Sequence, residues 1–491
     1  MDHTWEVAEM EKTTRSLSAL SERKTYVGSV LRFSVTAMLV GALVLVAKPG
    51  PVRSETQLGY SVASFNAGTN PSAAKVGDLD GDGRNDIAVV NRQGDLQLFF
   101  NDGAGSFQRV SLNGLWPSSA NTRDVDIGDL NADGRNDLAV AFSTQTGALS
   151  VLLNQGGRSF AAPVNYNSCN FSNGVAIGDL DRDGDNDLAD ISQCNRSGIL
   201  VNNGHGGFAL AGAYGGGAAS SSIALVDLNQ DGAKDIAYLN DSSVTILMNN
   251  GNATFGTPSM YWVWDMANDL AVGDFDGDGD ADIATVNAYY GVVFILINGG
   301  DGEMISYSEI PSYGIDAPTG IVVGDFNGDG RPLDFALISW GTSSLTVFVN
   351  QGYYTYGHSN PISVGQSPVD IAAGNLDDDS LPDLVSVNQG SGSISVLFSA
   401  VVAPPPPPPP PAPITLTVST SKTKTARLVD LRWSGATSSS VNIYRNGSLR
   451  TTVSNTGRYT DQFSKSATGT YRYKVCAAGS QTCSSEVAIS F

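Results

Sequence analysis

The central part of the chain alternates between strand-length apolar runs and short turns rich in Gly, Asn and Asp. Between residues 174 and 215, the segments GVAIGDL, NDLADI, GILVNN and GFALAGAYG follow one another, each ended by such a turn. Apolar runs of this length, bounded by turn residues, predict β-strands rather than helices. The pattern therefore predicts an all-β protein whose strands come in groups of four.

One part of this pattern recurs at a regular interval. The segment GDLDGDGRNDIAVV (residues 77–90) has six further copies, spaced 47 to 51 residues apart, whose acidic loops begin at Asp129, Asp179, Asp227, Asp274, Asp325 and Asn375. A four-stranded repeat of this period is typical of a propeller blade. We therefore expect a seven-bladed β-propeller over residues 58–400, followed by a small β-sandwich.

The two ends of the repeat region predict how the ring closes. The seventh unit stops after its third strand, SISVLFS (393–399), whereas an unmatched strand, YSVASFNAG (60–68), precedes the first loop. If the early strand completes the last blade, the ring has no open sheet edge. We therefore expect these two segments to pair.

The repeated loop follows the pattern D-x-[DN]-x-D-G-x-x-D. In its first copy Asp78, Asp80 and Asp82 alternate with other residues, Gly83 allows a sharp turn, and Asp86 closes the loop. A single copy would not distinguish an ordinary Asp-Gly turn from a cation site, but alternating oxygens repeated this often predict a cation site. Oxygen donors without His or Cys favour calcium. The expected ligands, including backbone carbonyl donors at the seventh loop position, are Asp78, Asp80, Asp82, Arg84, Asp86, Asp129, Asn131, Asp133, Arg135, Asp137, Asp179, Asp181, Asp183, Asp185, Asp187, Asp227, Asn229, Asp231, Ala233, Asp235, Asp274, Asp276, Asp278, Asp280, Asp282, Asp325, Asn327, Asp329, Arg331, Asp334, Asn375, Asp377, Asp379, Leu381 and Asp383.

The last two loops depart from the pattern. In the sixth, Pro332 and Leu333 place the closing Asp334 one residue late, and in the seventh Asn375 and Ser380 replace the first Asp and the Gly. We expect both to bind calcium more weakly than the other five.

The repeat unit resembles the FG-GAP/VCBS repeat, which forms the seven-bladed propeller of integrin α-subunits and occurs in many secreted bacterial proteins. The resemblance covers roughly residues 58–400 and includes turns such as NDGAGSF (101–107). It implies that five to seven calcium ions have a structural role and pin the loop between two strands of each blade.

The charge of the chain agrees with metal sites. The 491 residues include 28 Lys and Arg against 49 Asp and Glu, a net charge of −21, and 24 of the 41 Asp occupy positions where the side chain is the expected ligand. Residues 54–413 carry 41 acidic and 11 basic side chains. Such an acidic chain is not expected to bind nucleic acid.

Aromatic residues gather in the loops that lie on the face opposite the acidic loops. Exposed Trp and Tyr on loops of a rigid scaffold indicate a recognition surface, and flat rings beside polar groups suit carbohydrate. The alternative is that these rings pack between blades or fill the central channel. The candidate ligand-binding residues are Trp116, Tyr261, Trp262, Trp264, Tyr289, Tyr290, Tyr313 and Trp340.

Catalytic motifs are not evident in the sequence, which has no G-x-S-x-G, H-E-x-x-H or phosphate loop. The leading expectation is a non-catalytic binding or adhesion protein with a glycan or protein ligand. A polysaccharide lyase, using carboxylates such as Asp265, Asp269, Asp316 or Asp370, is one alternative. An extracellular scaffold that docks proteins is another.

The N-terminal segment and the cysteines both indicate an extracellular protein. Residues 1–53 contain an apolar segment (34–47) behind basic residues, which predicts a signal peptide or an N-terminal membrane anchor and hence a secreted or cell-surface bacterial protein. The four cysteines form two close pairs without a CxxC motif, which predicts two disulfides. The expected pairs are Cys169 with Cys194 and Cys476 with Cys483.

A proline-rich linker, residues 401–413, separates the repeats from residues 414–491. Its eight consecutive Pro predict a semi-rigid spacer.

In residues 414–491, apolar and polar residues alternate in strand-length runs, which predicts a small β-sandwich. Trp433 in an early strand and the Y-x-Y of Tyr471 and Tyr473 in a late strand resemble a fibronectin type III domain. Its ten basic and three acidic residues serve solubility in one interpretation, and in another they attract an anionic cell-surface polymer or the acidic propeller. We expect a monomer.

Overall fold

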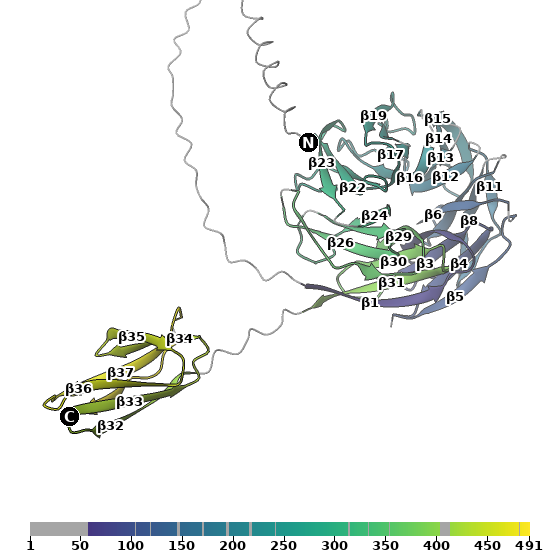
Figure 1. The fold of residues 1–491 in the computed structure, drawn as a ribbon. Coiled ribbons are helices and arrows are strands. Elements are labelled where there is room, and N and C mark those ends of the chain that lie inside the picture. Colours follow the sequence, from purple (N-terminus) through teal and green to yellow (C-terminus); the bar gives the residue numbers. More distant parts are fainter. Residues whose placement is uncertain are drawn as a thin grey trace, which may run out of the picture. The chain divides into compact units, whose positions relative to one another are not determined.

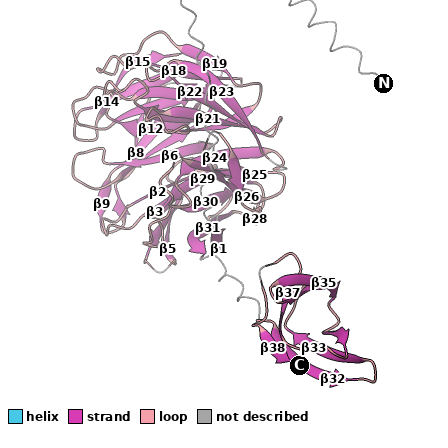
Figure 2. Cartoon of the chain, turned by 90° about the vertical axis from the view of Figure 1, so that its left-hand side faces the viewer, coloured by secondary structure: helices cyan, strands magenta, loops and turns pink. Residues whose placement is uncertain are grey.

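The computed structural model describes residues 57–402 and 413–491, apart from 104, 118, 145–147, 169–170, 193–195, 216–218, 241, 313–314, 332, 353 and 481. Strands and turns account for all the described residues, without a helix (Figure 2). No helix in these ranges is therefore long and apolar enough to cross a membrane. The predicted leader (1–53) and the proline run of the linker lie outside the described residues.

Seven antiparallel sheets, called blades 1 to 7, form a ring over the described part of residues 57–402 (Figure 1). The first strand of each blade is β2 (Pro71–Gly77), β6 (Thr122–Gly128), β12 (Ser172–Gly178), β16 (Ala219–Val226), β20 (Ala267–Gly273), β24 (Pro318–Gly324) or β29 (Pro368–Gly374). The second strand is β3 (Asp86–Asn91), β7 (Asp137–Phe142), β13 (Asp187–Ser192), β17 (Asp235–Asn240), β21 (Asp282–Asn287), β25 (Asp334–Ser339) or β30 (Asp383–Asn388).

The outer half of each blade contains the remaining strands. The third strand is β4 (Asp95–Asn101), β8 (Ala148–Leu152), β14 (Arg196–Asn202), β18 (Ser243–Leu247), β22 (Val292–Asn298), β26 (Ser344–Asn350) or β31 (Ser393–Val402). The fourth is β5 (Phe107–Leu112), β11 (Val164–Tyr166), β15 (Phe208–Tyr214), β19 (Ser259–Trp262), β23 (Met304–Pro311), β27 (Tyr356–His358) or β1 (Gln57–Asn66). Blade 2 adds the hairpin β9 (Asn154–Gly156) and β10 (Ser159–Phe160), and blade 6 adds β28 (Ile362–Ser363).

The ring is closed. The first strands contact one another in cyclic order, and β29 of blade 7 returns to β2 of blade 1. In blade 7, β1 pairs with β31 in antiparallel register, from Gln57 opposite Val402 to Asn66 opposite Ser393. The prediction that the early strand completes the last blade is confirmed, and the architecture is the all-β propeller that the repeats predict.

The hydrophobic core lies between the blades. All six residues of every second strand are buried, so neither face of these strands is exposed to solvent. The buried side chains form clusters that each join neighbouring blades, including one between blades 7 and 1 that contains Ile87, Val385 and Val396. Because every blade needs a partner on both sides, a closed ring is required to bury this surface.

The centre of the ring is lined with charged side chains that bond across blades. Asp124, Asp269 and Asp370 each accept a hydrogen bond from a backbone N–H of the next blade, at 2.8–3.0 Å. These bonds satisfy donors at the free inner edges of β2, β12 and β24, the first strands of blades 1, 3 and 6. Burial raises the pKa of Asp124 to about 6 and that of Asp370 to about 7. Although burial lowers the pKa of Lys75, the surrounding carboxylates outweigh it and raise that pKa overall.

Residues 413–491 form a separate β-sandwich. One sheet contains β32 (Thr415–Lys422), β33 (Ala426–Ser434) and β36 (Arg458–Ser464), and the other contains β34 (Ser440–Arg445), β35 (Ser448–Ser454), β37 (Thr470–Ala477) and β38 (Val487–Ser490). Trp433 and Tyr473 are buried between them. The buried carboxylate of Asp461 accepts hydrogen bonds from the Tyr473 hydroxyl and the Arg445 guanidinium, both at 2.8 Å. Cys476 and Cys483 form the expected disulfide.

Candidate metal centres and the aromatic loops

Each acidic loop joins the first and second strands of a blade and is folded around its own carboxylates. In the first loop, Asp78 accepts hydrogen bonds from the N–H groups of Gly81 and Gly83, at 2.7 and 2.9 Å. Asp80 and Asp82 each accept one from the N–H two residues further on. The φ of Gly83 is 88°, a left-handed conformation that favours glycine, which explains the Gly at the sixth loop position.

The aspartate that closes each loop also fastens it to the sheet. Asp86 is fully buried, and its two carboxylate oxygens accept hydrogen bonds from the N–H groups of Leu79 in the loop and Asn101 at the end of β4, at 2.9 and 2.8 Å. The same pair of bonds occurs in every blade. The closing residues are Asp86, Asp137, Asp187, Asp235, Asp282, Asp334 and Asp383.

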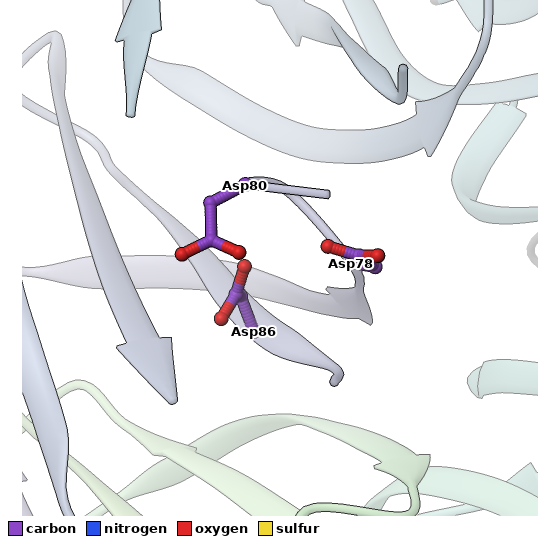
Figure 3. Close-up of side chains that lie close together, drawn as sticks. All are labelled: Asp78, Asp80 and Asp86. Carbon is purple, nitrogen blue, oxygen red and sulfur yellow. The ribbon is translucent and has the colours of Figure 1, made fainter. Parts of the chain in front are cut away.

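Three loops bring three carboxylates together closely enough to hold a metal ion. In blade 1, oxygens of Asp78, Asp80 and Asp86 all lie within 4.8 Å of one another, and Figure 3 shows the Asp80 and Asp86 carboxylates close together with Asp78 beside them. The loops of blades 3 and 5 do the same, whereas those of blades 2, 4 and 6 have Asn at the third position. All these donors are oxygens, which fits a hard cation.

Burial makes the closing carboxylates hard to ionise in the absence of a cation. It raises the pKa of most of them from 3.8 to about 6, and that of Asp334 to about 7, although backbone hydrogen bonds act in the opposite direction. Neighbouring loop aspartates raise the pKa further, because like charges repel. A bound cation would remove this penalty.

These raised pKa values predict a pH dependence. In the presence of chelator, the folded state binds more protons than the unfolded state between about pH 4 and pH 7, so the free energy of unfolding should fall as the pH rises. Because protons and calcium compete for the same oxygens, the increase in melting temperature caused by calcium should be larger at pH 7.5 than at pH 5. Thermal melts with calcium and with chelator at both pH values measure this difference. An equal increment at the two values would contradict the competition.

A second set of residues that fastens the loops was not identified from the sequence. In six blades an Asn at the end of the third strand, or two residues beyond it, donates a hydrogen bond of 2.7–3.0 Å from Nδ2 to a backbone carbonyl in the acidic loop of the preceding blade. Asn154, for example, donates to Leu79 O at 2.8 Å. The signal is the first Asn of turns such as NDGAGSF and NNGHGGF, and in blade 7 Ser399 stands at this position. Six of the seven loops are therefore coupled to the next blade by this bond.

Arginines neutralise part of the acidic surface. Arg84 and Arg135, expected to offer only their carbonyls, pair through their side chains with Asp82 and Asp133 of the same loop. Between blades, Arg158 lies 2.8 Å from Asp80, and the Arg182 side chain lies 2.7 Å from Asp231.

The two irregular loops differ in how much of the pattern they keep. Although Asp334 comes one residue late, it still accepts hydrogen bonds from Phe326 and Asn350. In the seventh loop the Asn375 amide donates to Asp379 O inside the loop. Weaker calcium binding by both loops stays a prediction.

The expected aromatic surface is smaller than predicted. Trp116 is only 4 % exposed, its Nε1–H donates to Ser150 Oγ at 2.8 Å, and its ring packs beside Phe142, so the prediction that it contributes to an exposed surface is wrong. The ring fills the core between blades 1 and 2, as the alternative interpretation proposed. Tyr261 and Trp264 are half-buried beside the core between blades 4 and 5.

Four of the predicted rings are exposed: Trp262, Tyr289, Tyr290 and Trp340. An open pocket is lined by Trp262, Trp264, Asp265 and Tyr290. These residues come from the connection between β19 and β20 and from the turn between β21 and β22, so the two kinds of loop meet on one face, as expected. Tyr313, Cys169 and Cys194 lie outside the described residues.

Comparison with known proteins agrees with the repeats and the fold. The FG-GAP-like repeat matches four segments, residues 78–140, 129–189, 227–285 and 274–332, so the chain contains FG-GAP-like repeats in a β-propeller. No curated protein matches the sequence as a relative.

The solved structures that match are distant in sequence. BBS1N, in a crystal structure of its complex with ARL6DN, is similar over 70 % of this chain and 97 % of its own, with 12 % identity and a TM-score of 0.50. A lectin from Agrocybe aegerita, described as recognising non-reducing terminal N-acetylglucosamine, is similar over 70 % of this chain and 95 % of its own, with 16 % identity and a TM-score of 0.45. At this identity the first likeness indicates the fold alone.

Proposed function

We propose that this protein is a calcium-stabilised, non-catalytic binding protein that acts outside the bacterial cell and holds a carbohydrate ligand on its aromatic loops. The observation that carries the proposal is the exposure of Trp262, Tyr289, Tyr290 and Trp340 on loops of a rigid, closed ring. Exposed rings on loops of such a scaffold are typical of recognition surfaces. Their flat faces suit the CH faces of sugars.

Calcium is the cation that the loops fit best. The donors are carboxylate, amide and carbonyl oxygens in flexible loops, a set that favours calcium over magnesium and excludes the softer ligands of zinc and copper. Asp78, Asp80 and Asp86 would hold the ion in blade 1, and equivalent residues would do so elsewhere. When bound, the ion would supply positive charge that offsets the repulsion between these carboxylates.

The β-sandwich supports the extracellular assignment. Its disulfide between Cys476 and Cys483 suits an oxidising compartment. Its three-stranded and four-stranded sheets, around Trp433 and Tyr473, support the resemblance to a fibronectin type III domain. We propose that its basic surface contacts an anionic cell-surface polymer, and that the propeller is monomeric.

Two of the four carboxylates considered for a lyase are used structurally. Asp269 and Asp370 lie in the ring centre and accept hydrogen bonds from Ile321 and Ala74 of the next blade. Binding is therefore the better-supported function. Turnover of an anionic polysaccharide, lost on changing Asp265 or Asp316, would favour the enzyme instead.

A glycan array probed with the calcium-loaded full chain tests the proposal. We expect binding to a defined group of glycans, and at least tenfold weaker binding by the variant Trp262→Ala/Tyr289→Ala. Tyr307→Ala is the matched control, because Tyr307 is equally exposed but lies on the outer strand β23, away from the loops. If the folded protein binds no glycan, the carbohydrate assignment fails. Stoichiometric recovery of a protein partner from the culture medium would then favour the scaffold.

A further inference from the structure

The pocket on the aromatic loops is formed by two segments that one buried residue holds together. Asn287, at the end of β21, is fully buried, and its side-chain oxygen accepts hydrogen bonds from the N–H groups of Tyr289 and Tyr290, at 3.1 and 3.0 Å. Its Nδ2 donates to the backbone carbonyl of Asp265 at 2.8 Å. The tyrosine turn and the Trp262–Met266 connection are therefore fixed relative to each other before any ligand arrives.

The aromatic rings are also fixed. Trp264 packs edge-on against Tyr290 and Phe294, with ring centroids 4.6 and 5.0 Å apart, and Tyr290 contacts Tyr289 at 4.9 Å. The φ of Trp264 is +66°, a left-handed conformation that a bulky residue rarely adopts. Backbone strain of this kind is concentrated at binding sites. By contrast, the positive φ of Met266 is shared by Asn121 and Ala317, which also precede first strands.

The hydrogen bond from an Asn at the end of the second strand to the connection before the first strand occurs in blade 1 as well as in blade 5, but blade 1 lacks the aromatic lining. In blade 1, Asn91 likewise donates from Nδ2 to a backbone carbonyl, that of Ala67 in the connection before the first strand. The residues that follow Asn91 are Arg92, Gln93 and Gly94, whereas Asn287 is followed by Ala288, Tyr289 and Tyr290. The pocket of blade 5 is therefore an aromatic version of a structural element that blade 1 also contains.

The chemistry of the lining indicates the charge of the ligand. Three aromatic rings and one carboxylate, that of Asp265, line the pocket, and Asp265 is exposed. The negative faces of Trp and Tyr attract a cation, and a nearby carboxylate adds to this attraction. Because the lining offers one carboxylate and few other acceptors, it suits a cation that needs no hydrogen bonds better than a primary amine.

The charge of the whole propeller also favours a cationic ligand. Residues 54–413 carry 41 acidic and 11 basic side chains, so the surrounding potential attracts cations and repels anions. Calcium in the acidic loops would reduce the excess of negative charge without making the propeller positively charged.

We propose that the pocket lined by Trp262, Trp264, Asp265 and Tyr290 binds a quaternary ammonium group, such as the trimethylammonium of a choline-type substituent. This inference rests on the proposed role of the aromatic loops in ligand binding and specifies the chemical group that they hold. Trp262 and Tyr290 provide the aromatic faces, Trp264 supports Tyr290, and Asp265 provides the counter-charge. Asn287 is a positioning residue.

Calorimetric titration of the calcium-loaded full chain with choline, and with its neutral isostere 3,3-dimethylbutan-1-ol, tests this proposal. The two compounds have the same shape and differ in charge, so we expect choline to bind about tenfold more tightly. Asp265→Asn should weaken choline binding several-fold and leave binding of the neutral alcohol unchanged. Trp262→Ala should weaken both.

A control separates the pocket from general effects. Tyr307→Ala, which removes an exposed ring on the outer strand β23 away from the loops, should leave choline binding unchanged. Equal affinity for choline and the alcohol, or no binding of choline by the folded protein, would overturn the ammonium assignment. If the glycan array is still positive in that case, the binding function stands and only the cation is wrong. If both assays are negative, both proposals fail.

Discussion

In excess chelator, the propeller should melt about 10 °C or more below its melting temperature in millimolar calcium. A site held at 100 times its dissociation constant adds about 2.7 kcal/mol to the free energy of unfolding, and several sites act on the same ring. Chelation would also leave Asp78, Asp80 and Asp86 repelling one another within 4.8 Å. Differential scanning calorimetry of the full chain, with calcium and with chelator, measures the shift.

Two comparisons make this result specific. Magnesium at the same concentration should restore much less of the stability than calcium, because flexible loops with several carboxylates favour the larger ion. Asp181→Ala/Asp183→Ala, which removes ligands from the third loop only, should reduce the calcium-dependent increment without abolishing it. An identical melt in calcium and in chelator would show that the loops are ordinary turns.

Asp187→Ala should destabilise the propeller by about 3–5 kcal/mol, even in chelator. The two oxygens of this buried carboxylate accept hydrogen bonds from Leu180 N and Asn202 N, both at 2.8 Å, and the substitution leaves both donors buried without a partner. The effect therefore arises from the fastening of the loop to the sheet and not from the metal. Urea unfolding in chelator measures it.

Asp183→Ala is the matched control in the same loop. Asp183 is exposed, and its carboxylate accepts a hydrogen bond only from the N–H of Asp185 within the loop, so in chelator its removal should cost less than about 1 kcal/mol. In calcium the two variants should become more similar, because both remove a ligand. Similar losses for the two variants in chelator would show that the closing aspartate has no separate structural role.

The repeat period and the loop pattern are sufficient to predict the ring, because both are local features that recur at one spacing. Ring closure was also predictable, since the strand missing from blade 7 and the spare strand before blade 1 leave one pairing, Gln57–Asn66 with Ser393–Val402. The bond between Cys476 and Cys483 follows from their separation of seven residues.

Features that depend on contact between blades could not be predicted in the same way. The sequence places Trp116 in a loop, but only the packing of blade 1 on blade 2 decides that its ring is buried beside Phe142. The hydrogen bond from Asn154 to Leu79 O joins residues 75 positions apart, and nothing local to the NQGG turn indicates its partner. The raised pKa of Asp370 likewise arises from its place in the ring centre and from Asp269.

The closure of blade 7 determines how the ring would respond to a pulling force. Because Gln57 lies opposite Val402, the chain enters and leaves the propeller at neighbouring points on the same edge. A load applied between those two points would therefore separate β1 from β31 one rung at a time from the Gln57–Val402 end, instead of shearing all ten pairs together. Blade 7 would therefore open first under such a load, while the acidic loops of the other blades stay folded.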